Sequence, residues 1–179
     1  MNRIQKWSNR IRIFFQIVLI GIPIGVIFQW VIYDGEALSL LNGLRYRHLD
    51  LPIVKSIPYS TRWLCFGIAM IKNAVTMFGF YHLIKLFKLY EKGQIFTLET
   101  IREMKICAYS VFGWCIAKFF TSILLILALT FHNPKGQRIL AVSFDATDFS
   151  TLVIGIITII TVQIMDEARM LKEEHDYII

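Results

Sequence analysis

The sequence predicts an all-α polytopic membrane protein with four transmembrane helices and helix extensions on one side of the membrane. The chain of 179 residues is 56% hydrophobic and only 18% charged, whereas soluble domains usually carry more charge and a lower apolar fraction. Four apolar runs approach the length of about 20 residues that a helix needs to cross a bilayer. Basic residues flank these runs, as they do in membrane proteins. The length fits one domain, so we expect residues 1–179 to form a single membrane domain.

The four transmembrane helices are expected at about residues 13–33, 63–83, 106–130 and 149–165. Basic residues precede the first run, as in a signal peptide. This run is too long for a signal-peptide core and no small-residue cleavage site follows it, so we expect a retained helix. Inside it, Pro23 should kink the helix, and Gly21 and Gly25 would allow a neighbouring helix to approach closely.

The distribution of Lys and Arg predicts that both termini and the connection between the second and third spans face the cytosol. Eleven basic residues fall on that side and six on the other. The eleven are Arg3, Lys6, Arg10, Arg12, Lys85, Lys88, Lys92, Arg102, Lys105, Arg169 and Lys172, and the six are Arg45, Arg47, Lys55, Arg62, Lys135 and Arg138.

The composition and motifs argue against several classes of protein. The net charge is +6, but a nucleic-acid-binding protein would carry its bases on a polar domain, so we expect no direct contact with nucleic acid. The chain has no CxxC pair and no HxxxH or HxxEH spacing, so we expect no metal and no cofactor. It also lacks GxSxG, HExxH and paired carboxylates within the spans, so we expect a protein that is not an enzyme.

The polar stretch LYEKGQIFTLET, residues 89–100, lies between the second and third apolar runs. Gly93 is well placed as a left-handed C-cap of one helix, and Thr97 as the N-cap of the next. Phe96 and Ile101 have the spacing of a hydrophobic staple around that second cap. The stretch therefore predicts a cytosolic helix–turn–helix connector. It either joins two spans and does nothing more, or it also binds a partner.

The tail, residues 166–179, is expected to continue the fourth helix into the cytosol and is acidic. Arg169 and Glu173 are spaced to form an ion pair one helical turn apart. The acidic residues would be held away from an anionic membrane surface. Two interpretations stay open: the acids pair with the basic N-terminal segment, or they bind a basic partner such as a DNA-binding regulator.

The turn and the tail together resemble the bacterial membrane proteins grouped as domain-of-unknown-function family 2975. Gly93, Phe96 and Thr97 match the turn pattern of that family. The tail matches it at Leu171, Lys172, Glu173, Glu174, Asp176 and Ile178, and departs from it at Tyr177 and Ile179. The resemblance implies four spans in a bacterial inner membrane with cytoplasmic N and C termini. It also implies a cytosolic partner of the Xre helix-turn-helix type, because such regulators are often encoded beside family members.

Two charged residues lie within the expected spans. At a rise of about 1.5 Å per residue, Lys72 and Lys118 fall near the middle of a ~30 Å hydrocarbon core, and no span contains Asp or Glu. Charges at this depth are candidate functional groups. Three possibilities stay open for these lysines. They are neutral, they line a site for an anionic head group or ligand, or they bond to polar neighbours. The polar neighbours are Asn73, Thr76, Thr121, Ser122 and helix carbonyls.

Two hypotheses for the function follow. The first is a membrane regulator or sensor that binds a cytosolic partner through the turn and the tail, at Tyr90, Glu91, Lys92, Gly93, Phe96, Thr97, Leu171, Glu173, Glu174 and Asp176. The second is a small transporter, or a protein that binds lipid or another anionic ligand, through Lys72, Asn73 and Lys118. The lipid bilayer surrounds the chain in either case, and a second copy of the chain is a further partner that the sequence leaves open.

Overall fold

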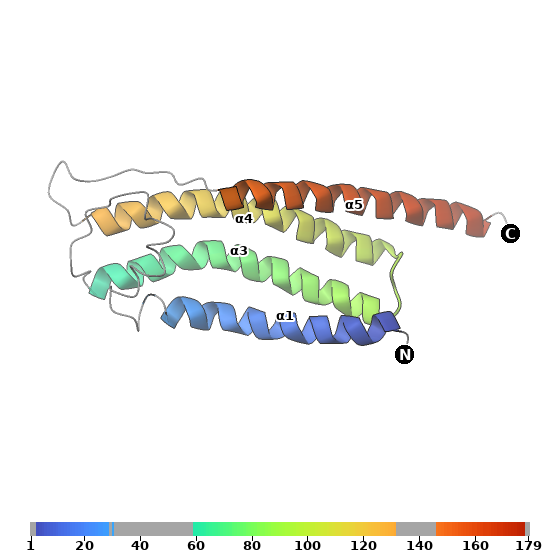
Figure 1. Cartoon of the computed structure of the whole chain (residues 1–179), viewed down its shortest axis with the longest axis horizontal. Helices are drawn as coiled ribbons and strands as arrows, with labels where there is room; N and C mark the ends of the chain where they lie inside the picture. The colour runs from blue at the N-terminus through green and yellow to red at the C-terminus, as the bar shows by residue number, and fades with distance from the viewer. Residues whose placement is uncertain (1–2, 29, 31–58, 132–145, 178–179) are drawn as a thin grey trace. The chain divides into compact units, whose positions relative to one another are not determined.

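The computed structural model describes residues 3–28, 30, 59–131 and 146–177 of the chain. These residues form four helices and no strand: α1 (Arg3–Ile27), α3 (Tyr59–Glu91), α4 (Leu98–Thr130) and α5 (Ala146–Tyr177) (Figure 1). The predicted all-α fold is therefore confirmed.

Each of the four helices is long and apolar enough to cross a membrane. At most 28% of the most apolar stretch of any of these helices is buried inside the protein. Most apolar side chains of these stretches therefore face outward. A soluble protein rarely exposes so much contiguous apolar surface, whereas lipid-facing helices require it. The architecture is that of a multi-pass membrane protein.

The helices extend beyond the predicted spans. α3 continues to Glu91 and α4 begins at Leu98, so only a short turn separates them. α1 begins at Arg3 and ends at Ile27, earlier than predicted, and residues 31–33 lie outside the described part of the chain. α5 begins at Ala146, before the predicted fourth span, so Asp148 lies in its first turn, where it is only 4% exposed. A carboxylate is favoured there because the helix N-terminus carries partial positive charge.

The chain forms two compact units. Unit 1 contains residues 1–20, 75–115 and 145–179, and unit 2 contains residues 21–74 and 116–144. In the described residues, unit 2 is built from the end of α1, the first half of α3 and the second half of α4. Its buried core gathers Val26, Trp30, Cys65, Ala69 and Ala128, most of which are small, as is usual where membrane helices approach closely.

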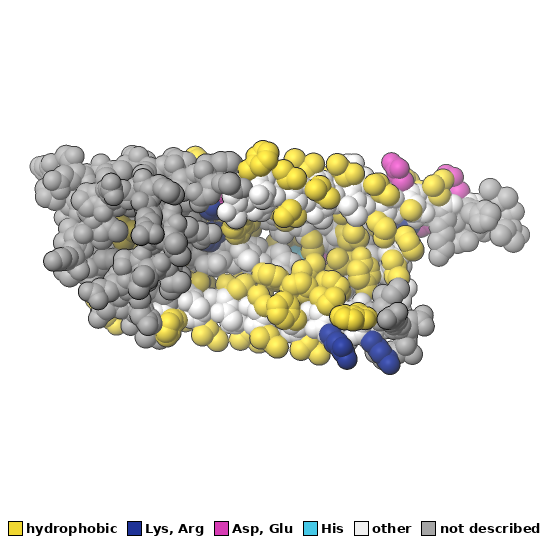
Figure 2. Space-filling model, viewed as in Figure 1, with side chains coloured by type: hydrophobic (Ala, Val, Ile, Leu, Met, Phe, Trp, Pro, Cys, Tyr) yellow, Lys and Arg dark blue, Asp and Glu magenta, His cyan; other side chains and the backbone are white. Residues whose placement is uncertain are grey.

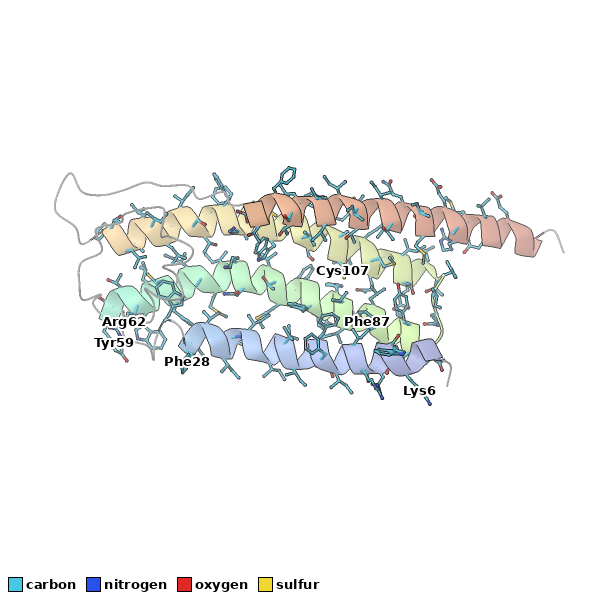
Figure 3. All side chains as sticks on the ribbon, in the orientation of Figure 1. Lys6, Phe28, Tyr59, Arg62, Phe87 and Cys107 are labelled. Carbon is cyan, nitrogen blue, oxygen red and sulfur yellow. The ribbon has the colours of Figure 1, made fainter. Side chains whose placement is uncertain are left out.

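In unit 1, helices that follow one another in the sequence pack together. α1 packs on α3 through Phe15, whose ring centroid lies 5.5 Å from that of Phe80 and 5.7 Å from that of Phe87. Figure 3 labels Phe87 on α3. α3 and α4 approach closely at Gly79, where an added Cβ would lie 2.7 Å from the Ser110 hydroxyl. α4 and α5 do so at Gly155, against the Phe112 ring.

The close approach expected at Gly21 and Gly25 does not occur among the described residues. A Cβ added to either glycine would have no neighbour within 4 Å. α1 continues through Pro23 to Ile27. The glycines that serve helix packing are instead in α3 and α5, because a glycine brings helices together only when it lies on the face that a neighbour covers.

The turn between α3 and α4 has the predicted local structure. Gly93 has a φ of 77° in the left-handed region, and its N–H donates to the Tyr90 carbonyl. The N–H of Gln94 donates to the Leu89 carbonyl at 3.1 Å, which completes a Schellman motif. At the start of α4, the Thr97 hydroxyl accepts a hydrogen bond from the Thr100 N–H at 3.3 Å. Both predicted caps are therefore confirmed.

Gly93→Ala should destabilise the protein by about 1 kcal/mol, because an L residue other than glycine is strained at this φ. Crowding adds little, since the nearest side-chain atom to the new Cβ, Gln5 Nε2, would be 3.8 Å away. Thermal unfolding in detergent micelles measures the effect. Gly93→Asn is the control and should cost less, because Asn tolerates the left-handed region better. Equal stability of Gly93→Ala and the wild type would contradict this role for the glycine.

Candidate functional site

The predicted partner-binding residues meet at one end of unit 1, which we call the turn end. It comprises residues 5–12 of α1, residues 82–105 around the α3–α4 turn, and residues 166–177 of α5. Three links inside this end fix the helices to one another: a buried His–Glu pair, an Arg–Glu pair and a Lys–Asp pair.

The first link joins α3 to α4 inside the hairpin. His82 Nδ1 and Glu103 Oε2 are 2.5 Å apart, and each residue is 8% exposed. The rings of Phe78 and Tyr81 pack on the imidazole, with centroids 4.5 and 5.4 Å from its own. A buried hydrogen bond between such groups is strong, and losing one partner leaves the other unsatisfied at a high cost.

Motif spacing does not predict this pair, because His82 and Glu103 are 21 residues apart and Glu103 lies outside the predicted spans. A signal was nevertheless present. In an antiparallel helical hairpin, residues about equally far from the turn oppose each other. His82 precedes Gly93 by 11 residues and Glu103 follows it by 10, so the pairing follows once the turn is located at Gly93.

Several predicted contact residues of the turn have structural roles. Glu91 pairs with Arg12 of α1 at 3.4 Å. The Tyr90 hydroxyl lies 3.5 Å from the Met104 sulfur, and burial, with a smaller contribution from Cys107, raises the pKa of this tyrosine. Gly93 and Thr97 are the helix caps. Lys92 is exposed and Phe96 is 45% exposed, so these two side chains are accessible at the turn. The contact that would make Phe96 a staple stays a prediction.

Ionic contacts fasten the start of the tail to α4. Lys105 Nζ lies 2.8 Å from Asp166, and this hydrogen bond, more than those from Arg169, lowers the pKa of the Asp166 carboxyl. Arg169 also donates to both oxygens of Glu173, at 2.6 and 2.7 Å, which raises the pKa of the guanidinium and confirms the predicted pair. The described part of the tail thus pairs with α4, and the N-terminal Arg12 pairs with α3.

Beyond these contacts, the last turns of α5 extend past the α3–α4 turn (Figure 1). Leu171 is 67% exposed, and Met170, Glu173 and Glu174 are exposed beside it. Acidic side chains on this extension are visible in Figure 2. Asp176 lies in the same helix. The turn end therefore presents a helix with exposed apolar and acidic groups, which we call the α5 extension (residues 170–177).

The candidate lipid- or ligand-binding residues Lys72, Asn73 and Lys118 lie in unit 2. Lys72 and Lys118 are half-buried, and both engage in side-chain interactions. The Asn73 amide donates to the Ala69 carbonyl at 3.0 Å, and the Ser122 hydroxyl donates to the Lys118 carbonyl at 2.8 Å. These two polar groups, which are among the possible partners of the lysines, therefore bond to the backbone of their own helices.

Comparison with known proteins identifies the family of the chain. A family model described as "Protein of unknown function (DUF2975)" matches residues 52–179. The chain belongs to this DUF2975 family. The match confirms the predicted resemblance. It covers α3, α4 and α5, including the hairpin and the α5 extension, whereas α1 precedes it. No curated protein and no solved structure matches the chain.

The described residues of this DUF2975 protein contain no group of three or more His, Cys, Asp and Glu side chains that would hold a metal ion. Cys65, Cys107 and Cys115 are free thiols. One buried side-chain group stands out in α4, where the Thr121 hydroxyl has no hydrogen-bond partner in the described part of the protein.

Replacing one member of the His82–Glu103 pair should destabilise the DUF2975 hairpin by about 2 kcal/mol, because the other side chain is left buried without a partner. His82→Leu and Glu103→Met are suitable single variants. The double variant should be more stable than the sum of the single effects predicts, since it buries no unpaired group. Unfolding in mixed micelles gives the three free energies.

Lys105→Gln is the control. It removes a half-exposed ion pair and should lower the free energy of unfolding by less than about 1 kcal/mol. Additive effects of His82→Leu and Glu103→Met would show that the two side chains do not stabilise each other.

Proposed function

We propose that this chain is a non-enzymatic regulator or sensor of the bacterial inner membrane that binds a cytosolic protein through its turn end. The observation that carries this proposal is the α5 extension, which presents Leu171 and Glu174 beyond the Lys105–Asp166 ion pair between α4 and α5. A helix that served only to cross the bilayer would not require an extension with exposed apolar and acidic groups on it.

The charge distribution supports a cytosolic location for the turn end. Most of the basic residues of the chain flank the apolar runs at this end, and Lys and Arg favour the cytosolic side of a membrane protein. Under this proposal the N and C termini are cytoplasmic, as in the layout that the family resemblance implies.

A green fluorescent protein fused after Ile179 should fluoresce in bacterial cells, because this reporter folds in the cytosol and stays dark when exported unfolded. Alkaline phosphatase fused at the same position should be inactive, because it needs the oxidising periplasm for its disulfides. The opposite pattern, a dark fluorescent protein and an active phosphatase, would place the turn end outside the cell and exclude a cytosolic partner.

The chemistry of the α5 extension favours a partner with a basic surface. Exposed carboxylates attract such a surface and orient it, while an exposed leucine beside them supplies apolar area to bury. DNA-binding proteins carry basic surfaces of this kind. The family resemblance points to a regulator of the Xre helix-turn-helix type. A regulator bound through its basic surface would be held at the membrane and kept from DNA.

The local contacts support a scaffold more than a catalyst. Several titratable side chains of the turn end are engaged in holding helices together, His82 with Glu103 and Glu91 with Arg12. Lys105 and Asp166 are engaged in the same way between α4 and α5. Groups held in such pairs fix the geometry of a binding surface, which is what a regulator that captures a protein requires.

A variant carrying Leu171→Glu and Glu174→Lys should lose the regulator. The changes remove the apolar anchor and reverse a charge on exposed side chains, so the fold should persist while binding falls by about tenfold or more. The measurement is affinity capture of the solubilised protein from its native cells, with mass spectrometry of the bound proteins and lipids.

Glu99→Lys is the matched control. It reverses an exposed charge of the turn end outside the α5 extension and should reduce capture less than the double variant does. Equal recovery of a DNA-binding regulator by the wild type and the double variant would exclude the α5 extension as its binding site. Recovery of lipid alone by the wild type would exclude the partner.

A further inference from the structure

The exposed face of α1 changes its chemistry along the helix. Its first part presents Lys6, Trp7 and Arg10, with Trp7 58% exposed. The same face continues with large apolar side chains, all of them exposed: Ile13, Phe14, Ile17, Ile20 and Ile24. Their spacing of three and four residues keeps them on one side of the helix. Figure 2 shows basic side chains at the end of a largely hydrophobic surface near the start of the chain.

Within the described part of the chain, Lys6 and Arg10 form no ion pair. Arg12 pairs with Glu91 of α3, but no carboxylate of the described residues pairs with Lys6 or Arg10. Lys6 points away from α3 (Figure 3). The Arg10 guanidinium lies over the Trp7 ring, 5.9 Å from its centroid, and this contact holds the cation beside an exposed aromatic surface.

The order of these side chains along α1 matches the change in polarity from the head-group layer of a bilayer to its hydrocarbon core. The apolar residues from Ile13 onward suit the hydrocarbon core. At about 1.5 Å per residue, Arg10 and Lys6 lie about 5 and 10 Å from Ile13 along the axis, which corresponds to the head-group layer. Tryptophan concentrates in that layer because its ring is apolar and its N–H is polar.

We propose that Lys6, Trp7 and Arg10 form a binding site for the head group of an anionic phospholipid. The phosphate accepts hydrogen bonds from the guanidinium and the ammonium, and the acyl chains lie along Ile13 and Phe14. The apolar continuation of the face selects a lipid over a free phosphate ion. This site does not depend on the α5 extension, which lies on a different helix of unit 1 and whose acidic groups an anionic surface repels.

Native mass spectrometry of the purified full-length protein, offered equal amounts of phosphatidylglycerol and phosphatidylcholine, tests the proposal. The wild type should retain phosphatidylglycerol preferentially. Lys6→Gln with Arg10→Gln should weaken that preference by about 25-fold, since each base near an anionic head group contributes a factor of about five. Exchanging the two bases, Lys6→Arg with Arg10→Lys, should preserve the preference because both charges remain.

Lys88→Gln with Arg102→Gln is the matched control. It removes the same net charge from two exposed side chains of the turn end and should change the preference less than twofold. The proposal is overturned if the Lys6 and Arg10 variant retains phosphatidylglycerol as well as the wild type does, or if the control pair loses as much. Displacement of the lipid by glycerol phosphate at equal concentration would also overturn it, because that molecule has no acyl chains to contact the apolar face.

Discussion

The hydrogen bond between His82 and Glu103 fixes the register of the α3–α4 hairpin, and the other contacts of the turn end depend on that register. A slip of one helix along the other would leave two buried polar groups without partners, at about 1–3 kcal/mol each. α1 attaches to this hairpin through Glu91, and α5 attaches through Lys105. The Schellman motif at Gly93 and the Thr97 cap hold the turn that joins the two paired helices. The hairpin therefore determines where both outer helices present their exposed faces.

Those exposed faces have opposite charges, and this difference gives each helix a separate role in the proposals. The basic and aromatic start of α1 suits the anionic head groups of a membrane, whereas the α5 extension carries carboxylates that such a surface repels. Figure 2 shows basic side chains near the start of α1 and acidic ones along α5. Within unit 1, the helix proposed to bind lipid and the helix proposed to bind a protein are thus linked to the same hairpin. Under the proposed function, α1 anchors the turn end on the membrane and α5 remains available to a basic protein.

The features that could be predicted from the sequence are those that residues close together in the sequence determine. Helix length and apolar composition located the four helices, the left-handed preference of glycine located the cap at Gly93, and the spacing of one helical turn predicted the pair of Arg169 with Glu173. Contacts between residues far apart in the sequence were not predicted. His82 with Glu103 and Lys105 with Asp166 are 21 and 61 residues apart, and each pairing requires the register of two helices. The same limit explains why close packing was expected at Gly21 but occurs at Gly79 and Gly155.

The most direct test of the central claim is photo-crosslinking in living cells, with benzoylphenylalanine in place of Leu171. The reactive group then lies at an apolar position of the α5 extension that is 67% exposed. The proposed function predicts an adduct with a soluble DNA-binding protein, and no such adduct when the same group replaces Phe120, an exposed apolar residue of the α4 transmembrane segment. Adducts at residue 171 with lipid alone, or the same protein adduct from both positions, would contradict the claim that the turn end is a surface for a cytosolic partner.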